Sequence, residues 1–394
     1  MKVLFVSAVL PYPPKSGGQI RMYQLLKRMA KKHEITLVSF IRDDKERAYE
    51  KDLGFCKKVI MVMRGRGLRL SYLFRALTGK YPLLLATYDN ETMKKTLTDL
   101  LTRETFELVH LEPFYDWPAI PKTHVPVVVS EHNVEYEVYE YHARRFWMPA
   151  LRPFLFLDAV KLRLWEHKVW ANVAARTAVS PEDAAAMKTA GEVTVVPNGV
   201  DLKAFSYAPR AKKAKGPAVL FVGDFRWFPN KDAAERLVSD IWPVIKKRFP
   251  GASFRIVGRH IPGGIAAAVR RAGGTVQSDV PDIAEEYRSA DALIAPHAIG
   301  GGTKFKMLEA MASGLPVITT KEGMAGLAAV SGTHYLQAAA PRDYVAQLEK
   351  IWDNRKIRDT ITAAARNLVE THYGWDAIAR ELDAVWKKTY EKTH

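Results

Sequence analysis

The stretch PHAIGGGTKFKMLEAMASGLPVI, residues 296–318, decides the fold class of this chain. It leaves an apolar run at Pro296, passes through three glycines, continues with helical spacing from about Thr303 to Gly314, and enters a second apolar run. A strand, a glycine loop, a helix and a strand in this order are typical of a parallel α/β sheet. Free amides at a helix start, the positive end of the helix dipole, and the nearby Lys304 and Lys306 suit phosphate oxygens.

The same helix carries one carboxylate, Glu309, among apolar residues. It lies about two turns from the helix start, which is too far for a cap. A carboxylate in so apolar a helix needs hydrogen-bond donors, and sugar hydroxyls are donors of this kind.

On both sides of this stretch and along the whole chain, short apolar runs alternate with longer amphipathic segments. This alternation predicts parallel sheets with helices on both faces. The expected strands are 3–8, 35–40, 58–62, 108–111, 125–130 and 177–179, and then 218–222, 253–257, 275–277, 292–295 and 316–319. This is the pattern of two doubly wound Rossmann-like domains, 1–204 and 205–374, that face each other across a cleft. The basic stretch between Tyr207 and Pro217 is the expected linker.

The length of 394 residues suits two or three domains, and the charge is strongly basic. The formal net charge is +16, and the first hundred residues hold 20 basic against 9 acidic side chains. Such an excess favours anionic partners: phosphates, nucleic acid or an acidic membrane surface. A single cysteine, Cys56, excludes an intramolecular disulfide and any multi-cysteine metal site, and fits a reducing compartment.

Membrane spanning and secretion are not expected. The sequence has no uninterrupted apolar run of about 18 to 20 residues. The apolar opening at 1–10 is followed by Pro-Tyr-Pro-Pro without a small-residue cleavage pattern, so it predicts a buried first strand rather than a signal peptide.

Two segments, 64–85 and 144–170, mix basic residues with large apolar ones. One interpretation makes them amphipathic helices packed on the sheet. The other makes them a docking face for an anionic membrane surface, where aromatic side chains sit in the interface and cations meet lipid phosphates.

Three further motifs lie where strands are expected to end. The loop after the first strand closes on Gly17 and Gly18, which let backbone approach a ligand at a helix start, although a tight turn explains such a pair equally well. His132 follows the strand 125–130 between carboxylates and could act as acid, base or hydrogen-bond partner, or be a plain surface histidine. Asn198-Gly199 within VVPNGVD, residues 195–201, is a turn signal.

With TKFKMLEAMASGLPVI at 303–318, VVPNGVD at 195–201 and the two-domain pattern, the chain resembles the retaining glycosyltransferases of family 4, which have the GT-B fold. The resemblance extends over essentially the whole chain. It implies that the N-terminal domain binds the acceptor and the C-terminal domain a nucleotide-sugar donor. It also implies that the last helix, within 375–394, crosses back to the first domain.

The resemblance assigns roles to particular residues. Glu309 matches the second Glu of the family's E-x7-E pattern and would hold the donor ribose, whereas Gly301 replaces the first Glu, which leaves sugar contacts to the amides of Gly301, Gly302 and Thr303. Asp224 stands where the family usually has an Arg that neutralises the diphosphate, and we expect Lys304 to supply that charge. The remaining residues that the resemblance places at the site are Gly17, Gly18, His132, Ser180, Asn198, Lys231, Lys306 and Val280, the last within the loop 278–282 that would read the nucleobase.

The expected function is therefore transfer of a hexose from a UDP- or GDP-linked sugar to a hydroxyl, with retention and without a metal or other cofactor. The expected acceptor is a glycan or lipid-linked glycan at the inner face of the membrane, as in polysaccharide or lipopolysaccharide synthesis, with the protein cytoplasmic or peripheral. His132, Lys304 and Glu309 are the expected catalytic residues. Two alternatives remain open: a nucleotide-sugar epimerase or hydrolase of the same fold, and a polyanion-binding protein, although no recognisable nucleic-acid module is present.

Overall fold

The computed structural model describes residues 1–64, 70–188, 191–208, 215–299 and 303–393. The chain forms two compact units: unit 1 is Met1–Val196 with Ile378–His394, and unit 2 is Pro197–Ala377. The division thus falls between Val196 and Pro197 rather than near residue 205. Helix α16 (Trp375–Thr393) begins at the end of unit 2 and continues within unit 1.

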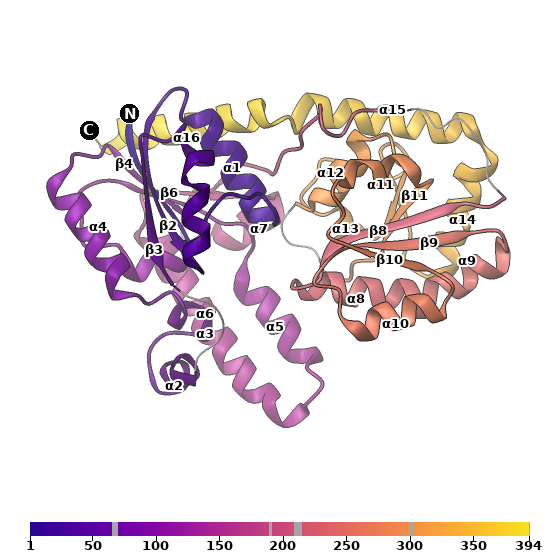
Figure 1. The fold of residues 1–394 in the computed structure, drawn as a ribbon, viewed down its shortest axis with the longest axis horizontal. Helices are drawn as coiled ribbons and strands as arrows, with labels where there is room; N and C mark the ends of the chain where they lie inside the picture. The colour runs from indigo at the N-terminus through magenta and orange to yellow at the C-terminus, as the bar shows by residue number, and fades with distance from the viewer. Residues whose placement is uncertain (65–69, 189–190, 209–214, 300–302, 394) are drawn as a thin grey trace. The chain divides into compact units, whose positions relative to one another are not determined.

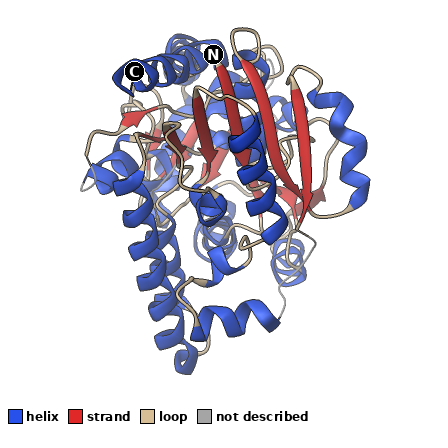
Figure 2. Ribbon diagram, turned by 90° about the vertical axis from the view of Figure 1, so that its left-hand side faces the viewer, coloured by secondary structure: helices blue, strands red, loops and turns tan. Residues whose placement is uncertain are grey.

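Unit 1 is built on one parallel sheet of seven strands in the order β3-β2-β1-β4-β5-β6-β7. In chain order the strands are β1 (Lys2–Ser7), β2 (Glu34–Ile41), β3 (Lys58–Met63), β4 (Leu108–Glu112), β5 (Val127–Ser130), β6 (Ala175–Ala178) and β7 (Thr194–Val195). Figure 2 shows this sheet with its surrounding helices. The apolar runs place six of these strands within two residues of their observed ends, whereas β7 is too short to be recognised in the sequence.

The helices of unit 1 follow the strands in the alternating order that parallel pairing requires. They are α1 (Gly17–Met29), α2 (Leu70–Thr78), α3 (Leu83–Ala86), α4 (Glu91–Arg103), α5 (Glu135–Arg145), α6 (Arg152–Asn172) and α7 (Pro181–Met187). The described residues of unit 1 also form the 3₁₀ segments η1 (Asp44–Leu53), η2 (Phe114–Ala119) and η3 (Pro149–Leu151).

The strand order of unit 1 reverses between β1 and β4, which makes this pair the switch point of the sheet. The register pairs Ser7, the last residue of β1, with Glu112, the last residue of β4. Ligands of doubly wound sheets bind at the carboxyl ends of the strands at such a point. Glu112 is therefore placed at the edge where a ligand is expected.

Unit 2 repeats the plan with six parallel strands in the order β10-β9-β8-β11-β12-β13, and its switch point lies between β8 and β11. The strands are β8 (Ala218–Asp224), β9 (Ser253–Arg259), β10 (Thr275–Ser278), β11 (Ala292–Ala295), β12 (Val317–Thr319) and β13 (Leu336–Gln337). The helices are α8 (Phe228–Arg236), α9 (Trp242–Arg248), α10 (Gly263–Arg271), α11 (Ile283–Ser289), α12 (Phe305–Ala312), α13 (Lys321–Met324), α14 (Pro341–Asp353) and α15 (Arg355–His372), with the π-helical turn η5 (Leu237–Ile241) before α9. Figure 1 shows these elements along the chain.

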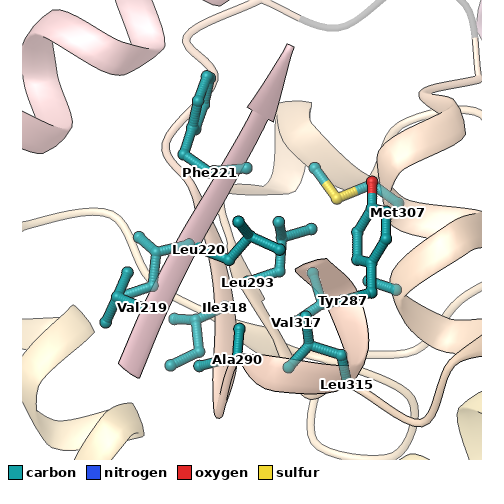
Figure 3. Close-up of a cluster of buried hydrophobic side chains, with 14 of the residues drawn as sticks. Val219, Leu220, Phe221, Tyr287, Ala290, Leu293, Met307, Leu315, Val317 and Ile318 are labelled. Carbon is teal, nitrogen blue, oxygen red and sulfur yellow. The ribbon is translucent and has the colours of Figure 1, made fainter. Parts of the chain in front are cut away.

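The core of unit 2 explains why the stretch 296–318 is rich in apolar residues. Figure 3 shows Leu220, Leu293 and Ile318 from three neighbouring strands packed together, with Met307 of α12 close to Tyr287. All five side chains are fully buried. The helix spacing predicted from the sequence is thus the spacing that puts one face of α12 against the sheet.

Helix α12 ends where the sequence places a glycine. Gly314 has φ of +71°, a left-handed conformation in which a side chain is strained, and a Cβ there would lie 2.6 Å from the Tyr207 ring. Its amide and that of Leu315 donate to the carbonyls of Met311 and Ala310 and so satisfy the helix end. The turn directs the chain straight into β12.

The two basic and apolar segments do not simply pack on the sheet. Helix α6 buries Leu162 and Trp170, but it exposes Phe154, Leu157 and Leu164 on its other side. Helix α2 buries only Ala76 and exposes apolar side chains along its length. The interpretation of both segments as amphipathic helices packed on the sheet therefore describes the buried side of α6, but it leaves these exposed apolar side chains unexplained; Arg66 and Arg69 lie outside the described residues.

Across the described ranges, no helix is long and apolar enough to cross a membrane.

Candidate functional site

The carboxyl edge of the unit 1 sheet holds a buried carboxylate with three basic partners. Arg21 Nε donates to Glu112 Oε1 at 2.8 Å, His110 Nε2 donates to Glu112 Oε2 at 3.0 Å, and His132 Nε2 lies 2.8 Å from Glu112 Oε1. Arg21 and Glu112 are almost completely buried. Burial alone would raise the pKa of Glu112, but the charge of Arg21 and the hydrogen bonds from both histidines hold that pKa well below its usual range. Glu112 is therefore an anion.

The tautomer of His110 follows from its partners. Trp386 Nε1 of α16 can only donate, and it lies 3.0 Å from His110 Nδ1, so this nitrogen is an acceptor. His110 Nε2 then carries the proton that is donated to Glu112. Burial lowers the pKa of His110, which agrees with a neutral ring. The last helix of the chain thus fixes a ring at the base of the site.

His132 is oriented by the same carboxylate. Because Glu112 is ionised, His132 Nε2 donates to it and Nδ1 points the other way. A Cβ on Gly18 would lie 2.9 Å from His132 Nδ1, closer than real contacts of this kind. Gly18 is the second residue of α1, so only a glycine lets the helix start approach this ring. The structure thereby brings Gly18 and His132 together, and Gly17 precedes Gly18 at the helix start.

In unit 2 the corresponding edge holds a buried cation instead. Lys306 Nζ donates to Asn230 Oδ1 at 2.6 Å and lies 3.2 Å from His297 Nε2. It also lies 4.6 Å from the centre of the Phe221 ring. Burial and the charge of Lys304 lower the pKa of Lys306 to about 7, although Glu309 opposes this shift. Asn230, His297 and Phe221 are all uncharged partners, since burial also lowers the pKa of His297 well below its usual value.

Glu309 is held by a tyrosine from the neighbouring helix. Tyr287 Oη of α11 donates to Glu309 Oε2 at 2.7 Å, and Glu309 itself is half-buried. Burial raises the pKa of Glu309, while the Tyr287 hydrogen bond and the charge of Lys306 lower it. The carboxylate is thus fixed through one oxygen, and its other oxygen takes no part in the Tyr287 bond.

The helix start that follows the glycine loop is positioned by the VVPNGVD segment. The Asn198 amide donates to Thr303 Oγ1 at 3.2 Å, and Asn198 Nδ2 donates to the Thr303 carbonyl at 3.1 Å. Both residues are buried. Lys304 Nζ donates to the Glu322 carbonyl at 3.0 Å. Asn198 therefore supports the loop through Thr303, while Gly301 and Gly302 lie outside the described residues.

The structure shows the surroundings of the other expected residues. Asp224, at the end of β8, accepts hydrogen bonds from Arg226, and its pKa is lowered by that guanidinium despite partial burial. Half-buried Lys231 follows Asn230 in α8, and it is Asn230 whose side chain contacts Lys306. Val280 packs against the unit 2 core. Ser180 caps α7, where its Oγ accepts from the Asp183 amide.

Sequence reasoning missed several members of both clusters. These are Arg21, His110, Glu112 and Trp386 in unit 1, and Arg226, Asn230 and His297 in unit 2. The signal for Glu112 was present, because a carboxylate closes the apolar run 108–111 at an expected strand end. Arg21 lies on the helix that the apolar spacing predicts, but only the fold shows that it turns inward. Across the residues that the structure describes, no group of three His, Cys, Asp or Glu side chains is arranged to hold a metal ion.

Comparisons with known proteins agree with this architecture. The family model described as "Glycosyltransferase Family 4" matches residues 15–204, and that described as "Glycosyl transferases group 1" matches residues 216–354. The phosphatidyl-myo-inositol mannosyltransferase of Mycobacterium tuberculosis is 31% identical over 210 residues, 49% of this chain and 53% of that protein. That of Mycobacterium leprae is 27% identical over 244 residues, 57% of this chain and 61% of that protein. The chain thus matches little more than half the length of these relatives.

Solved structures show the same fold at low identity. A sucrose-phosphate synthase from Thermosynechococcus elongatus superposes with a TM-score of 0.73 at 17% identity, over 100% of both chains. Anabaena HepE in complex with UDP and glucose gives a TM-score of 0.69 at 13% identity, over 98% of this chain and 100% of that one. WaaG, described as a glycosyltransferase involved in lipopolysaccharide biosynthesis, gives 0.67 at 15% identity, over 98% of this chain and 99% of that one.

Proposed function

Because this chain belongs to glycosyltransferase family 4 and has the GT-B fold, we propose that it transfers a hexose from a nucleotide diphosphate sugar to a hydroxyl acceptor. The anomeric configuration is retained and no metal ion is required. The acceptor is a glycan or a lipid-linked glycan of the cell surface. Unit 2 binds the donor and unit 1 the acceptor.

The buried lysine of unit 2 carries the proposal. Lys306 has hydrogen-bond partners but no anion among them, and burial together with the charge of Lys304 lowers its pKa to about 7. A diphosphate bound at the adjacent start of α12 would supply the missing negative charge and stabilise the protonated amine. As the donor breaks, charge grows on the leaving diphosphate, and Lys304 and Lys306 would stabilise it without a metal.

Glu309 suits the ribose of the donor. Tyr287 holds one of its oxygens and so fixes the direction of the carboxylate. Ribose hydroxyls are donors of the kind that a half-buried carboxylate needs. Backbone amides at 301–303 would then meet the sugar, in place of the acidic residue that Gly301 replaces.

Retention follows from a front-face route in this proposal. The bond from the anomeric carbon to the diphosphate oxygen breaks, the acceptor oxygen attacks from the same face, and the acceptor proton passes to the leaving phosphate. Glu112 is engaged by Arg21 and both histidines, which suits an orienting anion rather than a nucleophile. His132 Nδ1 is the nitrogen left to bond a sugar or acceptor hydroxyl.

The relatives support the finer points of donor and acceptor. The mycobacterial relatives are named for mannosyl transfer to phosphatidyl-myo-inositol, HepE was solved with UDP and glucose, and WaaG is described with lipopolysaccharide synthesis. These names support a hexose donor and a lipid-borne acceptor at the inner face of the membrane for this chain.

Nucleotide binding is the first test. Melting temperatures are measured with UDP, GDP, ADP, CMP and dTDP compounds, with and without EDTA, because a ligand that binds only the folded state raises the melting temperature. We expect one base to give a selective shift that EDTA leaves unchanged and that Lys304→Ala reduces. No shift from any nucleotide would contradict the proposal.

Product analysis separates transfer from the competing reactions. With the selected donor and no acceptor, a transferase leaves the sugar nucleotide essentially intact. Release of free sugar, or its conversion to an epimer, at the full catalytic rate would indicate the hydrolase or epimerase alternative instead.

A further inference from the structure

The unit 1 surface formed by α2 and α6 exposes large apolar side chains that nothing in the described structure covers. On α2, Leu70, Leu73, Phe74 and Leu77 are 36–84% exposed. On α6 and the loop before it, the exposed side chains are Trp147, Leu151, Phe154, Leu157, Val160 and Leu164. Isolated apolar side chains on a surface are normal, but this many on two neighbouring helices mark an interaction site.

The exposed side chains of each helix lie on one face. At 100° per residue, Leu70, Phe74 and Leu77 fall within about 60° of one another around α2. Phe154, Leu157 and Leu164 occupy the side of α6 opposite the buried Leu162 and Trp170. A helix that is apolar on two opposite sides packs one face against the core and leaves the second face available to bind a partner.

The two helices are joined into one surface. Lys161 Nζ of α6 donates to the Ala76 and Gly79 carbonyls at the end of α2, at 2.6 and 3.0 Å. Trp165 Nε1 donates to the Lys80 carbonyl at 2.8 Å. Figures 1 and 2 both show α2 at the same end of unit 1 as the turn between α5 and α6. The apolar faces therefore belong to one end of the unit.

The two segments that form this surface are predominantly basic. The sequence 64–85 contains no acidic residue, and 144–170 contains two, Asp158 and Glu166. Asp158 accepts from the Leu83 amide, and Glu166 is buried and accepts from the Glu135 and Tyr136 amides, so both face inward. The exposed charged side chains that these segments place around the apolar face are basic: Arg75, Lys80, Arg144, Arg145, Arg163 and Lys168. Two of them also pair with carboxylates outside the two segments, Arg75 with Asp89 at 3.6 Å and Arg144 with Glu140 at 3.9 Å, so these two positive charges are partly compensated.

We propose that the exposed apolar and basic surface of α2 and α6 docks on the face of an anionic lipid bilayer. The apolar side chains enter the boundary between headgroups and acyl chains, and the basic side chains meet lipid phosphates. A second copy of this chain fits poorly, because a two-fold contact would place the same positive charges opposite one another. Nucleic acid would match the positive charge, but it has no apolar region into which the exposed leucines could insert. The inference concerns binding, and it holds whether or not the proposed transfer reaction does.

The experiment uses the full chain and vesicles of phosphatidylcholine alone or mixed with phosphatidylglycerol. We expect sedimentation with the anionic vesicles, weakened by high salt, and little with the neutral ones. The variant Phe74→Ser/Leu77→Ser/Phe154→Ser/Leu157→Ser should bind at least about ten-fold more weakly. The variant Arg75→Gln/Arg145→Gln/Lys168→Gln should lose the preference for anionic lipid.

The matched control is Val244→Ser/Val330→Ser, which removes exposed apolar side chains from unit 2 and should bind as the unchanged protein does. Thermal unfolding establishes that each variant folds. Equal binding to neutral and anionic vesicles, or undiminished binding by the quadruple serine variant, would overturn the proposal. A concentration-dependent dimer or a nucleic-acid complex that this variant abolishes, without vesicle binding, would also overturn it and give the surface to that partner.

Nucleotide-induced melting shifts keep this result apart from the transfer reaction. The quadruple serine variant should retain them, since its substitutions lie in unit 1. Vesicle binding without any nucleotide shift would leave the docking surface standing and contradict the transferase proposal.

Discussion

The two units place opposite charges at equivalent points of equivalent sheets, and they treat these charges differently. In unit 1 the buried anion Glu112 has a full set of basic partners within its own unit: Arg21, His110 and His132. In unit 2 the buried cation Lys306 has only uncharged hydrogen-bond partners. The pKa values reflect this difference. The pKa of Glu112 is held well below its usual range, whereas the pKa of Lys306 falls to about 7.

The difference indicates what each edge is built for. A compensated anion is complete without a ligand, so Glu112 serves to fix the rings around it. A buried cation without an anion among its hydrogen-bond partners is costly even with the charge of Glu309 nearby, and an anionic ligand would stabilise it. If the proposed function holds, the unit 2 edge receives a negative charge that arrives with the donor, whereas the unit 1 edge holds a histidine in place.

Removing the anion of unit 1 should have the largest effect. Glu112→Gln leaves Arg21 buried without its counter-ion, and we expect a loss of about 3–5 kcal/mol in the free energy of unfolding, with at least about 100-fold lower transfer activity. Chemical denaturation and initial rates measure the two quantities. The exposed Glu50→Gln is the matched control and should change neither. A fully stable Glu112→Gln protein would show that the anion is not the centre of the cluster.

The contact from α16 should have the next largest effect. Trp386→Phe keeps the ring but removes the donor to His110 Nδ1, leaving a buried acceptor unsatisfied, at a cost of about 1–3 kcal/mol. Because His110 Nδ1 then lacks its donor while Nε2–H still donates to Glu112, the ring should take up a second proton more readily, and the pH profile of kcat should also change. The comparison is the half-buried Trp352→Phe, in unit 2. An unchanged pH profile together with lower stability would reduce Trp386 to a packing role.

The cation of unit 2 should respond in the opposite sense. Lys306→Met removes a buried amine whose charged form is disfavoured by burial and by the charge of Lys304, so the free protein should gain about 1 kcal/mol of stability while nucleotide affinity falls about ten-fold. Calorimetric titration at pH 8 in two buffers of different ionisation enthalpy sharpens the test. Binding to the unchanged protein should take up protons, because a diphosphate raises the pKa of Lys306, and the variant should lose this uptake. Equal proton uptake by both proteins would refute the assignment.

The pH dependence of stability should differ between the units by a smaller amount. Burial raises the pKa of Glu131 to about 8 from an ordinary 4.5, so the folded unit 1 binds more protons than the unfolded chain between these values and loses stability as pH rises. The pKa of Lys306 falls from 10.5 to about 7, so unit 2 gains stability as pH rises through this range. Each group contributes at most about 1.4 kcal/mol per pH unit.

Hydrogen exchange resolved by peptide, at pH 7 and pH 8 and corrected for the intrinsic rate, measures both trends in one protein. Unit 1 should lose protection and unit 2 should gain it. Glu131→Gln should flatten the first trend and Lys306→Met the second. Parallel trends in both units would show that other groups dominate.

Much of the fold could be predicted because strands and helices carry local periodicity. The apolar runs locate eleven strands, and the strands that escape prediction, β7 and β13, have two residues each. The boundary was less accessible, because the basic stretch between Tyr207 and Pro217 has the composition of a linker although it lies within unit 2, which begins at Pro197. The glycine positions could also be interpreted from the sequence. Gly314 ends helix α12, and Gly18 leaves room for the His132 ring.

The sequence by itself determined the doubly wound class, the family and the residues of the deciding stretch, since spacing and glycine positions act over a few residues. Only the tertiary structure decided which polar groups meet: Glu112 is separated from Arg21 by 91 residues and Trp386 from His110 by 276. It also decided that the apolar face of α2 and one of the two faces of α6 remain exposed, because a helical pattern shows that a face is apolar but not what covers it.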